Sequence, residues 1–460
     1  MSTAQNPTTR FAAPGEPGFD TATRVFNLTA PARPDLAATV RSVPEVRAAL
    51  RRAVAERLPV RMHSTGHASG AVRPVRGGLL LQTTLDGPVE IDPERRVARI
   101  PAGTPWGAVV HAAAEHGLAA PHGSSELVGA VGYLLRGGLS FYGRRIGLAA
   151  NSVRAVELVT ADGELRRADA TNEPDLFWAL RGGGGGLGVV TAIEVELFAA
   201  TEVITGGAYW PAAHAEELLS IWRRWSLTAP DEATTSVRVM NLPPAPDVPP
   251  VLAEGPVFCV DGVFMGTAGE PGRVHEQYAE LLAPLRAVAE PVLDHWAPST
   301  TSAVLEAHMD PAEPMPFVGD HMMLAEFGDE GVLTFLDAVG ENSGSPLVAA
   351  GLRQLGGAFA RPDPAGGVLD HFDAAYAYLG AGIPGGPVTE DEIREHAAKV
   401  RAALTPWDTG RTAPSLIETF AQPQGHLTAD QVVAVDRVRS TVDPDGLFRG
   451  DIMPRTTALY

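Results

Sequence analysis

The spacing of apolar and polar residues divides the first 200 residues into short helices and strands. Apolar residues recur at helical spacing in three segments, 42–55, 106–116 and 173–180. Ser42 is the expected N-cap of the first helix, and Gly117 ends the second. β-branched or alternating runs predict strands over 58–62, 78–82, 97–100, 153–160 and 189–197. This mixture indicates an α+β fold in which helices cover one face of a sheet.

The pattern changes near residue 200. From about 201 to 405 the glycine-bearing turns are fewer and longer amphipathic helices are expected, over 213–226, 273–288 and 389–404. Thr389 and Glu392 form a capping-box pattern at the start of the last one. Strands are predicted over 257–264 and 347–355. The domain prediction is therefore 1–200, 201–405 and a C-terminal segment, 406–460.

Five consecutive glycines, Gly182 to Gly186, are the strongest local signal. A dinucleotide-binding pattern, G-x-G-x-x-G, can be placed on Gly183, Gly185 and Gly188. That pattern requires a strand before it and a helix after it. Here a predicted helix precedes the glycines and a predicted strand follows them, which argues against a Rossmann site. The run instead predicts main chain that lies unusually close to a neighbouring surface.

Composition excludes several functional classes. The 460-residue chain has a formal net charge of −19 and no basic block, which disfavours nucleic acid and anionic membranes as partners. Residues 1–20 lack a secretory signal pattern and no apolar run has the length of a membrane span, so a soluble cytoplasmic protein is expected. The single cysteine, Cys259, predicts a buried thiol. No P-loop pattern and no metal-ligand spacing occurs, so no metal is expected.

Three loops combine glycine with small side chains, as a diphosphate-binding cradle requires. They span 64–70, 122–138 and 182–186. Each is more often a tight turn when it occurs alone. Their order and spacing together indicate a nucleotide cofactor.

The chain resembles the vanillyl-alcohol-oxidase / para-cresol-methylhydroxylase superfamily of FAD enzymes, and within it the berberine-bridge-enzyme-like oxidoreductases. The residues that carry the resemblance are Thr65-Gly66-His67, Ala102-Gly103, Gly129-Ala130-Val131-Gly132, Gly137-Gly138-Leu139, 147–153, 175–191, Leu355-Gly356-Gly357-Ala358 and 443–449. The likeness covers nearly the whole chain. It is strong in 55–200 and in the tail, and weak in 205–345.

The resemblance implies the fold and the cofactor. Two α+β subdomains within 1–200 would bind FAD, and 201–405 would place an antiparallel sheet, covered by helices, over the flavin ring. The segment 406–460 would return to the FAD domain. The residues expected at the cofactor are His63, Ser64, Thr65, Gly66, His67, Ala68, Gly123, Ser124, Ser125, Val128, Gly129, Gly132, Tyr133, Gly138, Asn151, Gly186, Gly188 and Val190.

The resemblance also implies covalent attachment of FAD through His67, because a neutral imidazole can attack the flavin 8α carbon. Many relatives carry a second attachment through a cysteine where this chain has Ser125. A serine hydroxyl does not replace a thiolate, so a single attachment is expected. Val128 occupies a position associated with O₂ access, which predicts an oxidase that releases hydrogen peroxide.

The catalytic base is less well defined. Relatives often place a tyrosine in a C-terminal Tyr-x-Asn-Phe stretch, which corresponds here to 416–420 without the tyrosine or the asparagine. Glu418 is the nearest candidate base, and Tyr142, Tyr376 and Tyr378 are alternatives. His308 and His321 have no assigned role.

The resulting prediction is an FAD-dependent oxidase of a small organic molecule, such as an alcohol, a sugar or a natural-product intermediate, in bacterial secondary metabolism. O₂ and the substrate are the expected partners. Three alternatives remain open: a flavin-dependent oxygenase, a flavin-binding protein without turnover, and a metal-dependent enzyme, which would be colourless.

Overall fold

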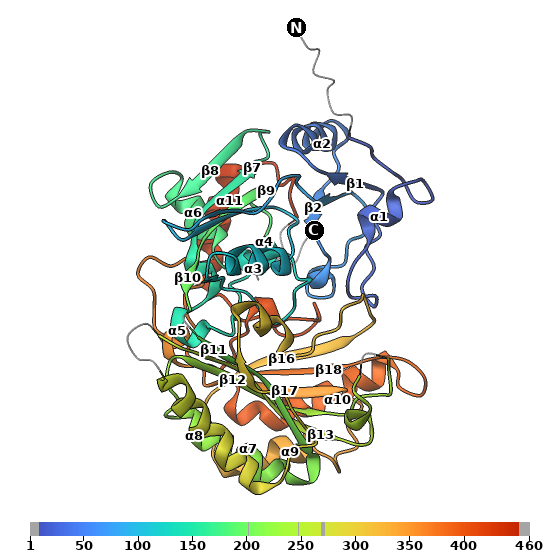
Figure 1. Ribbon diagram of the computed structural model, residues 1–460. Helices are drawn as coiled ribbons and strands as arrows, with labels where there is room; N and C mark the ends of the chain where they lie inside the picture. Colours follow the sequence, from blue (N-terminus) through green and yellow to red (C-terminus); the bar gives the residue numbers. More distant parts are fainter. Residues whose placement is uncertain (1–8, 201, 247, 268–271, 450–460) are drawn as a thin grey trace.

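The computed structural model describes residues 9–200, 202–246, 248–267 and 272–449. It consists of two bodies that face each other (Figure 1). The strands up to residue 199 form three sheets in the upper body, and the strands from residue 203 onward form one large sheet in the lower body. The expected mixture of helices and antiparallel sheet is confirmed.

The upper body begins with a small parallel sheet. Its order is β1 (Leu36–Val40), β3 (Leu79–Thr83) and β2 (Val60–His63), with α1 (Phe19–Thr23) beside it. Helix α2 (Val43–Glu56) connects β1 to β2 and buries Val46, Ala49, Leu50 and Ala53. The Ser42 hydroxyl accepts a hydrogen bond from the backbone N–H of Glu45, as the capping pattern predicts. β2 therefore delivers the loop that follows His63 to the interior of the molecule.

The second subdomain is a five-stranded antiparallel sheet. Its order is β4 (Glu90–Asp92), β5 (Val97–Pro101), β9 (Val189–Glu196), β7 (Val153–Val159) and β8 (Leu165–Asp169). Helices that share its core include α3 (Trp106–Ala114), α4 (Ala130–Leu135) and α6 (Pro174–Leu180). Short pieces flank this core: β6 (Leu118–Ala119) paired with β10 (Phe198–Ala199), and α5 (Gly143–Ile146).

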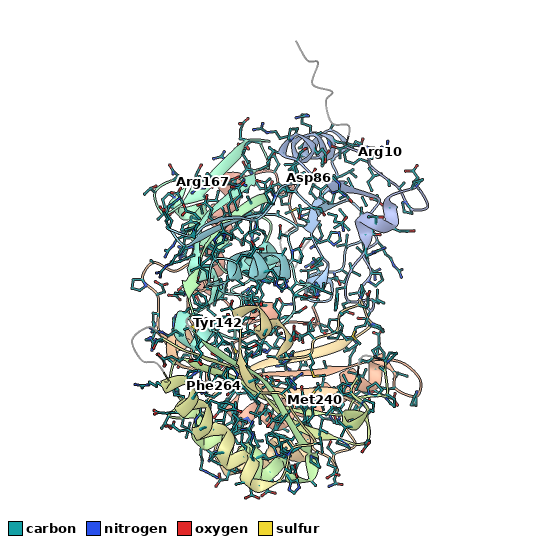
Figure 2. All side chains as sticks on the ribbon, in the orientation of Figure 1. Arg10, Asp86, Tyr142, Arg167, Met240 and Phe264 are labelled. Carbon is teal, nitrogen blue, oxygen red and sulfur yellow. The ribbon has the colours of Figure 1, made fainter. Side chains whose placement is uncertain are left out.

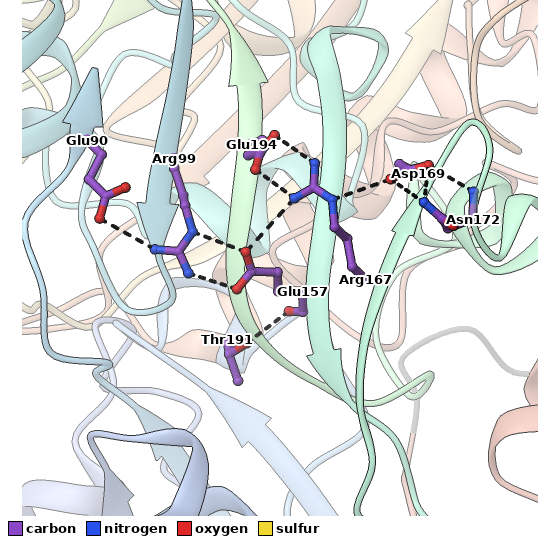
Figure 3. A network of polar contacts seen from close by, with 8 residues as sticks. All are labelled: Glu90, Arg99, Glu157, Arg167, Asp169, Asn172, Thr191 and Glu194. Atoms are coloured by element: carbon purple, nitrogen blue, oxygen red, sulfur yellow. Dashed lines mark hydrogen bonds and ion pairs between the residues drawn. The ribbon is translucent and has the colours of Figure 1, made fainter. Parts of the chain in front are cut away.

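A ladder of ion pairs crosses this sheet (Figure 3). Arg99 on β5 makes a two-pronged contact with Glu157 on β7, and Arg167 on β8 does the same with Glu194 on β9. Each pair reaches across one intervening strand, because β9 lies between β5 and β7 and β7 lies between β9 and β8; the four side chains are on a polar, partly exposed face. Cross-strand pairs of this kind fix register more than they add stability.

The lower body is built on an eight-stranded sheet. Seven strands follow one path: β14 (Leu293–Asp294), β11 (Val203–Pro211), β13 (Val257–Met265), β12 (Ala233–Met240), β17 (Ala349–Gln354), β18 (Tyr376–Gly382) and β16 (Val318–Leu324). The eighth, β15 (Ala297–Ser299), pairs with β11. Neighbouring strands pair antiparallel, which is the sheet that the resemblance implied.

Four helices cover the face of this sheet that points away from the upper body (Figure 1). They are α7 (Ala215–Ser226), α8 (Arg273–Val288), α9 (Asp329–Val339) and α10 (Glu390–Leu404). Their apolar sides and one face of the sheet form a single core that includes Trp210, Trp222 and Phe264. The predicted capping box of α10 is confirmed, because Thr389 and Glu392 exchange both hydrogen bonds. The other sheet face is left for the upper body.

The C-terminal segment returns to the upper body. Helix α11 (Ala429–Val442) contacts α6, and the backbone around Phe448 pairs with Val60 of β2. The Asp443 carboxylate accepts hydrogen bonds from the backbone N–H groups of Leu447 and Phe448, at 2.7 and 2.8 Å. These bonds explain why the Asp-Pro-Asp-Gly-Leu-Phe run forms a compact turn.

Elements of both bodies were not predicted from the sequence. They include β11, β12, β16, β18 and α9 in the lower body, and β1, α4 and α11 in the upper body. Strand β18 has no β-branched residue and is rich in alanine and glycine, and Gly206-Gly207 interrupts the β-branched start of β11, so both lack a continuous strand pattern. None of the described helices is long and apolar enough to cross a membrane.

Candidate active site

A cavity of about 1170 Å³ lies between the two bodies. Its upper wall consists of the loop after β2, the loop between β6 and α4, and part of the glycine run. Its lower wall consists of β12, β17 and β18, and the segments 308–311 and 414–421 close its sides. All three glycine-bearing loops named from the sequence therefore reach one cavity.

The loop after β2 places His67 on the cavity wall. Gly66 has φ +75°, and a Cβ there would lie 2.5 Å from the backbone Cα of Val25. Only glycine fits that conformation and that contact, so the Gly-His sequence is a packing requirement. The His67 ring stacks on Phe26 with centroids 4.0 Å apart.

The two nitrogens of His67 differ. Nδ1 lies 2.8 Å from Thr65 Oγ1, whereas Nε2 is buried and has no hydrogen-bond partner among the described residues. Burial lowers the pKa of His67 to about 4, against a smaller opposing effect of the Asp310 charge. The imidazole is therefore neutral at physiological pH, with one nitrogen held and the other available.

The second loop is fixed to the first. The backbone N–H of Gly129 donates to Thr65 Oγ1 at 3.3 Å, so this hydroxyl links the two loops. A Cβ on Gly129 would lie 2.4 Å from Ser64 Oγ. Ser125 accepts a hydrogen bond from the backbone of Leu127 at 3.3 Å, which is the role of a turn-forming serine.

The glycine run has two functions. Gly182 and Gly183 pack against the protein itself, since a Cβ on Gly182 would lie 2.3 Å from Leu369 Cβ and one on Gly183 would lie 2.1 Å from a backbone oxygen. Gly185 and Gly186 line the cavity. The sequence predicted that the glycine main chain lies close to a neighbouring surface. For Gly182 and Gly183 that surface is the protein itself, and only the later glycines face the cavity.

The lower wall carries charge. Alternate residues of β12, Ser236 and Arg238, line the cavity, and Arg353 lines it from the neighbouring strand β17. Arg238 is paired with the fully buried Asp261 of β13, with N···O distances of 2.6 and 2.9 Å, and Ser236 also donates to this carboxylate. The guanidinium of Arg353 lies 4.2 Å from the ring centroid of Phe141. Sequence reasoning missed these arginines; the signal was polar residues at period two within a strand-like run.

The segment after the short helix 301–306 adds a paired histidine and aspartate. His308 Nδ1 lies 2.9 Å from Asp310 Oδ1, and both residues line the cavity. Burial opposes the charge of Asp310, yet His308, a hydrogen bond from Ser124 and the charge of Arg238 hold the pKa of this carboxyl well below its usual range. The sequence reading left His308 without a role and did not consider Asp310.

Glu418 also lines the cavity, on the side of the His67 loop. Burial raises the pKa of Glu418 to about 8, and the Arg136 charge only partly opposes this. At neutral pH its side chain is therefore mainly the protonated acid, which donates a hydrogen bond rather than accepting a proton.

Most of the residues predicted to bind the cofactor line the cavity, and two do not. The expected cofactor residues that line the cavity are His63, Ser64, Thr65, Gly66, His67, Ala68, Gly123, Ser124, Ser125, Val128, Gly129, Gly132, Tyr133, Gly186, Gly188 and Val190. Gly138 and Asn151 do not line it. A Cβ on Gly138 would lie 2.4 Å from the Tyr133 ring, and the Asn151 amide donates to the backbone of Asp370 at 2.8 Å, so both residues serve packing.

The structure corrects the placement of the three tyrosines proposed as bases. Tyr376 and Tyr378 share one face of β18, but it is the face covered by helices, and Tyr376 hydrogen-bonds Ser226 of α7 at 3.0 Å. The intervening residue Ala377 lines the cavity instead. Tyr142 is fully buried where the two bodies meet (Figure 2), next to Phe198, and does not line the cavity. Burial raises the pKa of all three phenols, which further disfavours a role as base.

The residues present fit an FAD molecule. The cavity exceeds the usual size of a small-ligand site, as a dinucleotide with a substrate requires. His67 and Tyr133 line it, and each has a buried polar atom, His67 Nε2 and the Tyr133 hydroxyl, without a hydrogen-bond partner among the described residues. Glycine main chain lines the upper wall, where close approach of a large planar ligand is needed.

Comparison with known proteins agrees with this fit. Residues 34–169 match the family model described as FAD binding domain. (R)-6-hydroxynicotine oxidase of Paenarthrobacter nicotinovorans is 33% identical over 208 residues, which are 45% of each chain. The chain thus spans about half the length of the curated relatives it matches.

Solved structures share the fold over nearly the full length. 6-Hydroxy-D-nicotine oxidase from Arthrobacter nicotinovorans superposes with a TM-score of 0.81 at 23% identity, covering 96% of each chain. Berberine-bridge-enzyme-like 1 from Physcomitrella patens gives 0.80 at 18% identity, covering 97% and 96%. Glucooligosaccharide oxidase from Acremonium strictum, described with a 6-S-cysteinyl, 8α-N1-histidyl FAD, gives 0.77 at 20% identity, covering 97% of each. The chain therefore contains an FAD-binding domain and has the vanillyl-alcohol-oxidase / para-cresol-methylhydroxylase type of fold, which it shares with a berberine-bridge-enzyme-like protein.

Proposed function

We propose that this protein is an FAD-dependent oxidase of a small organic molecule, with the flavin attached once, through His67. The observation that carries the proposal is the neutral imidazole of His67, which lines a cavity large enough for a dinucleotide and a substrate and whose Nε2 has no hydrogen-bond partner among the described residues. When bound, FAD would accept a hydride equivalent from the substrate and pass its electrons to O₂.

The upper wall would hold the cofactor. The Thr65 hydroxyl positions the His67 ring through Nδ1, and Phe26 restricts the ring from one side, so attack through Nε2 needs little reorganisation. Ser125 stands where a second, cysteinyl attachment would require a thiolate, and its hydroxyl is engaged by the Leu127 backbone. These contacts support one attachment.

The lower wall would receive the substrate. Arg353 and the Arg238–Asp261 pair supply fixed charge, whereas Ala349, Ala377 and other small residues leave room above the sheet. Such a surface suits a molecule with one polar, oxidisable end and an apolar body. The names of two relatives, (R)-6-hydroxynicotine oxidase and xylooligosaccharide oxidase, support an amine or alcohol substrate.

Acid denaturation of the purified protein tests the attachment. We expect the yellow colour to remain with the polypeptide, and a peptide containing His67 to carry the mass of FAD. His67→Ala should release all flavin on denaturation. His63→Gln is the matched control, because His63 lines the same cavity but its Nε2 is bound to the backbone oxygen of Ala22 at 2.8 Å. Flavin that stays bound to His67→Ala would overturn the assignment.

Reoxidation tests the oxidase assignment. Val128 lines the cavity and leaves a small side chain at the position associated with O₂ access. After anaerobic reduction, air should restore the flavin spectrum within seconds and yield hydrogen peroxide. Recovery over many minutes would indicate a dehydrogenase, and incorporation of labelled O₂ into the product would indicate an oxygenase.

A further inference from the structure

His308 and Asp310 form a paired acid–base group on the cavity wall that no other feature of the molecule explains. We propose that His308 is the base that takes the proton from the substrate's hydroxyl or amine group, and that Asp310 is the residue that positions it. This inference rests on the proposed function, since it assigns the proton half of the same oxidation.

The geometry is that of an oriented imidazole. His308 Nδ1 faces the Asp310 carboxylate at 2.9 Å, which places the ring proton on Nδ1 and leaves the lone pair on Nε2. No described residue hydrogen-bonds Nε2, and the side chain lines the cavity. A carboxylate that holds one imidazole nitrogen while the other faces the substrate is the arrangement that general-base catalysis requires.

The backbone between the two residues is strained in a way that maintains this pair. Met309 has φ +52°, a left-handed conformation that is uncommon for a residue with a side chain. The Tyr209 hydroxyl donates to Met309 Sδ at 3.0 Å, and the Met309 backbone N–H donates to Glu306 at 3.3 Å. These contacts hold a conformation that brings the side chains of positions 308 and 310 together.

The pair also lies at the junction of both walls. Ser124, on the upper wall, hydrogen-bonds the Asp310 carboxylate, and the charge of this carboxylate acts on both His67 and Glu418. On the lower wall, Asp310 interacts with the charges of Arg238 and Arg353. His308 interacts with Asp261, and its ring lies 6.0 Å from the centroid of Phe141. A substrate placed between the walls is therefore within the field of this group.

Other titratable groups at the cavity are less suited to accept a proton near pH 7. Glu418 is mainly protonated there, because burial raises its pKa to about 8. Burial also raises the pKa of Tyr133 far above neutrality. The Asp310 carboxylate is ionised but is engaged by His308 and Ser124.

The proton balance of the step is simple. One proton leaves the substrate oxygen or nitrogen for His308 Nε2, giving an imidazolium that Asp310 stabilises. The carbon–hydrogen bond would break with its electron pair, for which bound FAD would be the two-electron acceptor, and the electron pair left on oxygen or nitrogen would form the C=O or C=N bond. The imidazolium then returns its proton to water.

Four proteins test the proposal: wild type, His308→Gln, Asp310→Asn and His371→Gln. His371 is the matched control, because it makes the same type of pair, with Asp370 at 2.7 Å, and does not line the cavity. All four should carry flavin equally. A panel of amines, alcohols and 6-hydroxynicotine is screened under anaerobic conditions for the substrate that bleaches the wild-type flavin fastest. With that substrate, His308→Gln should lower the bleaching rate by about 10²–10³-fold.

Relative to wild type, Asp310→Asn should lower the flavin-bleaching rate about 10-fold, and His371→Gln should leave it unchanged. Substrate affinity should change less than about 3-fold in each, which separates loss of a base from loss of binding. The acidic limb of the pH–rate profile should disappear in His308→Gln. An unchanged rate and profile in that variant would overturn the assignment of His308 while leaving the oxidase proposal intact.

A spectroscopic measurement requires no substrate. The ¹⁵N NMR signal of His308 in ¹⁵N-histidine-labelled holoenzyme is assigned by its loss in His308→Gln. At pH 8 this signal should show a neutral ring with its proton on Nδ1, and Asp310→Asn should abolish the preference for Nδ1. A ring protonated on Nε2, or an imidazolium from pH 6 to 9, would contradict the proposal. If no substrate in the panel bleaches wild-type flavin, the proposed oxidase function fails, and this measurement still decides whether the pair is built as described.

Discussion

The two walls of the cavity are made in different ways. The upper wall consists of glycine-rich loops and short side chains, and its main specific side chain is His67. The lower wall consists of strand residues at period two, including charged groups that are buried and paired, such as Arg238. A large cofactor common to a family can be bound by main chain, whereas a particular substrate must be recognised by side chains.

Sequence similarity follows the same division. The family match ends at residue 169, inside the upper body, whereas the fold is shared over nearly the whole chain. Glycine positions in the upper wall tolerate few substitutions because backbone contacts fix them. The sheet below can change its cavity-facing residues without changing its hydrogen-bonded frame.

The largest effect is expected at the buried ion pair of the lower wall. Asp261→Asn would leave the Arg238 guanidinium buried without its carboxylate, and should lower the free energy of unfolding by about 3–5 kcal/mol. Urea unfolding followed by tryptophan fluorescence measures this. A decrease in the free energy of unfolding of less than about 1 kcal/mol would contradict this expectation. It would mean that water from the cavity solvates the Arg238 guanidinium in place of the carboxylate.

The next effect concerns the upper wall. Gly66→Ala forces a side chain into a left-handed conformation and within 2.5 Å of the Val25 backbone, so the His67 loop must move. Covalent flavin content should fall at least about 10-fold while the fold persists. Gly117→Ala is the control, since Gly117 has φ +67° but nothing within 4 Å of its Cβ. Equal flavin content in both variants would mean that the loop tolerates displacement.

Acid should destabilise both bodies through buried neutral histidines. Burial lowers the pKa of His122 and of His321 to about 4 from 6.5. The unfolded chain therefore binds more protons than the folded one between about pH 4 and 6.5, so the free energy of unfolding should fall as pH decreases through that range, by on the order of 1–3 kcal/mol per group. In His321 a hydrogen bond also requires the neutral form, because Nε2 accepts from the Ala413 N–H at 2.9 Å.

Stability measured by urea unfolding from pH 7 to 4 checks this expectation. In the control variant His371→Gln, the free energy of unfolding should depend on pH as it does in wild type. A profile that is flat down to pH 4 would contradict the assignment of neutral buried imidazoles.

The smallest effect is expected away from both walls, in the ladder of Figure 3. Arg99→Met removes a partly exposed contact to Glu157 and should change the free energy of unfolding by less than about 1 kcal/mol. The difference from wild type should shrink further in 0.5 M salt. A loss comparable to that of Asp261→Asn would show that the ladder, rather than core packing, holds the five-stranded sheet.

The sequence alone determined the local features of the upper wall: the Gly-His loop, the glycine runs, and the helix caps at Ser42 and Thr389. These depend on backbone conformation and on partners a few residues away, which a single segment specifies. Only the tertiary structure decided which face of β18 meets the cavity, and so removed Tyr376 and Tyr378 from it. It also brought His308 and Asp310 beside Ser124, because contacts between residues nearly 200 positions apart arise from the packing of two bodies and leave no periodic signal in the chain.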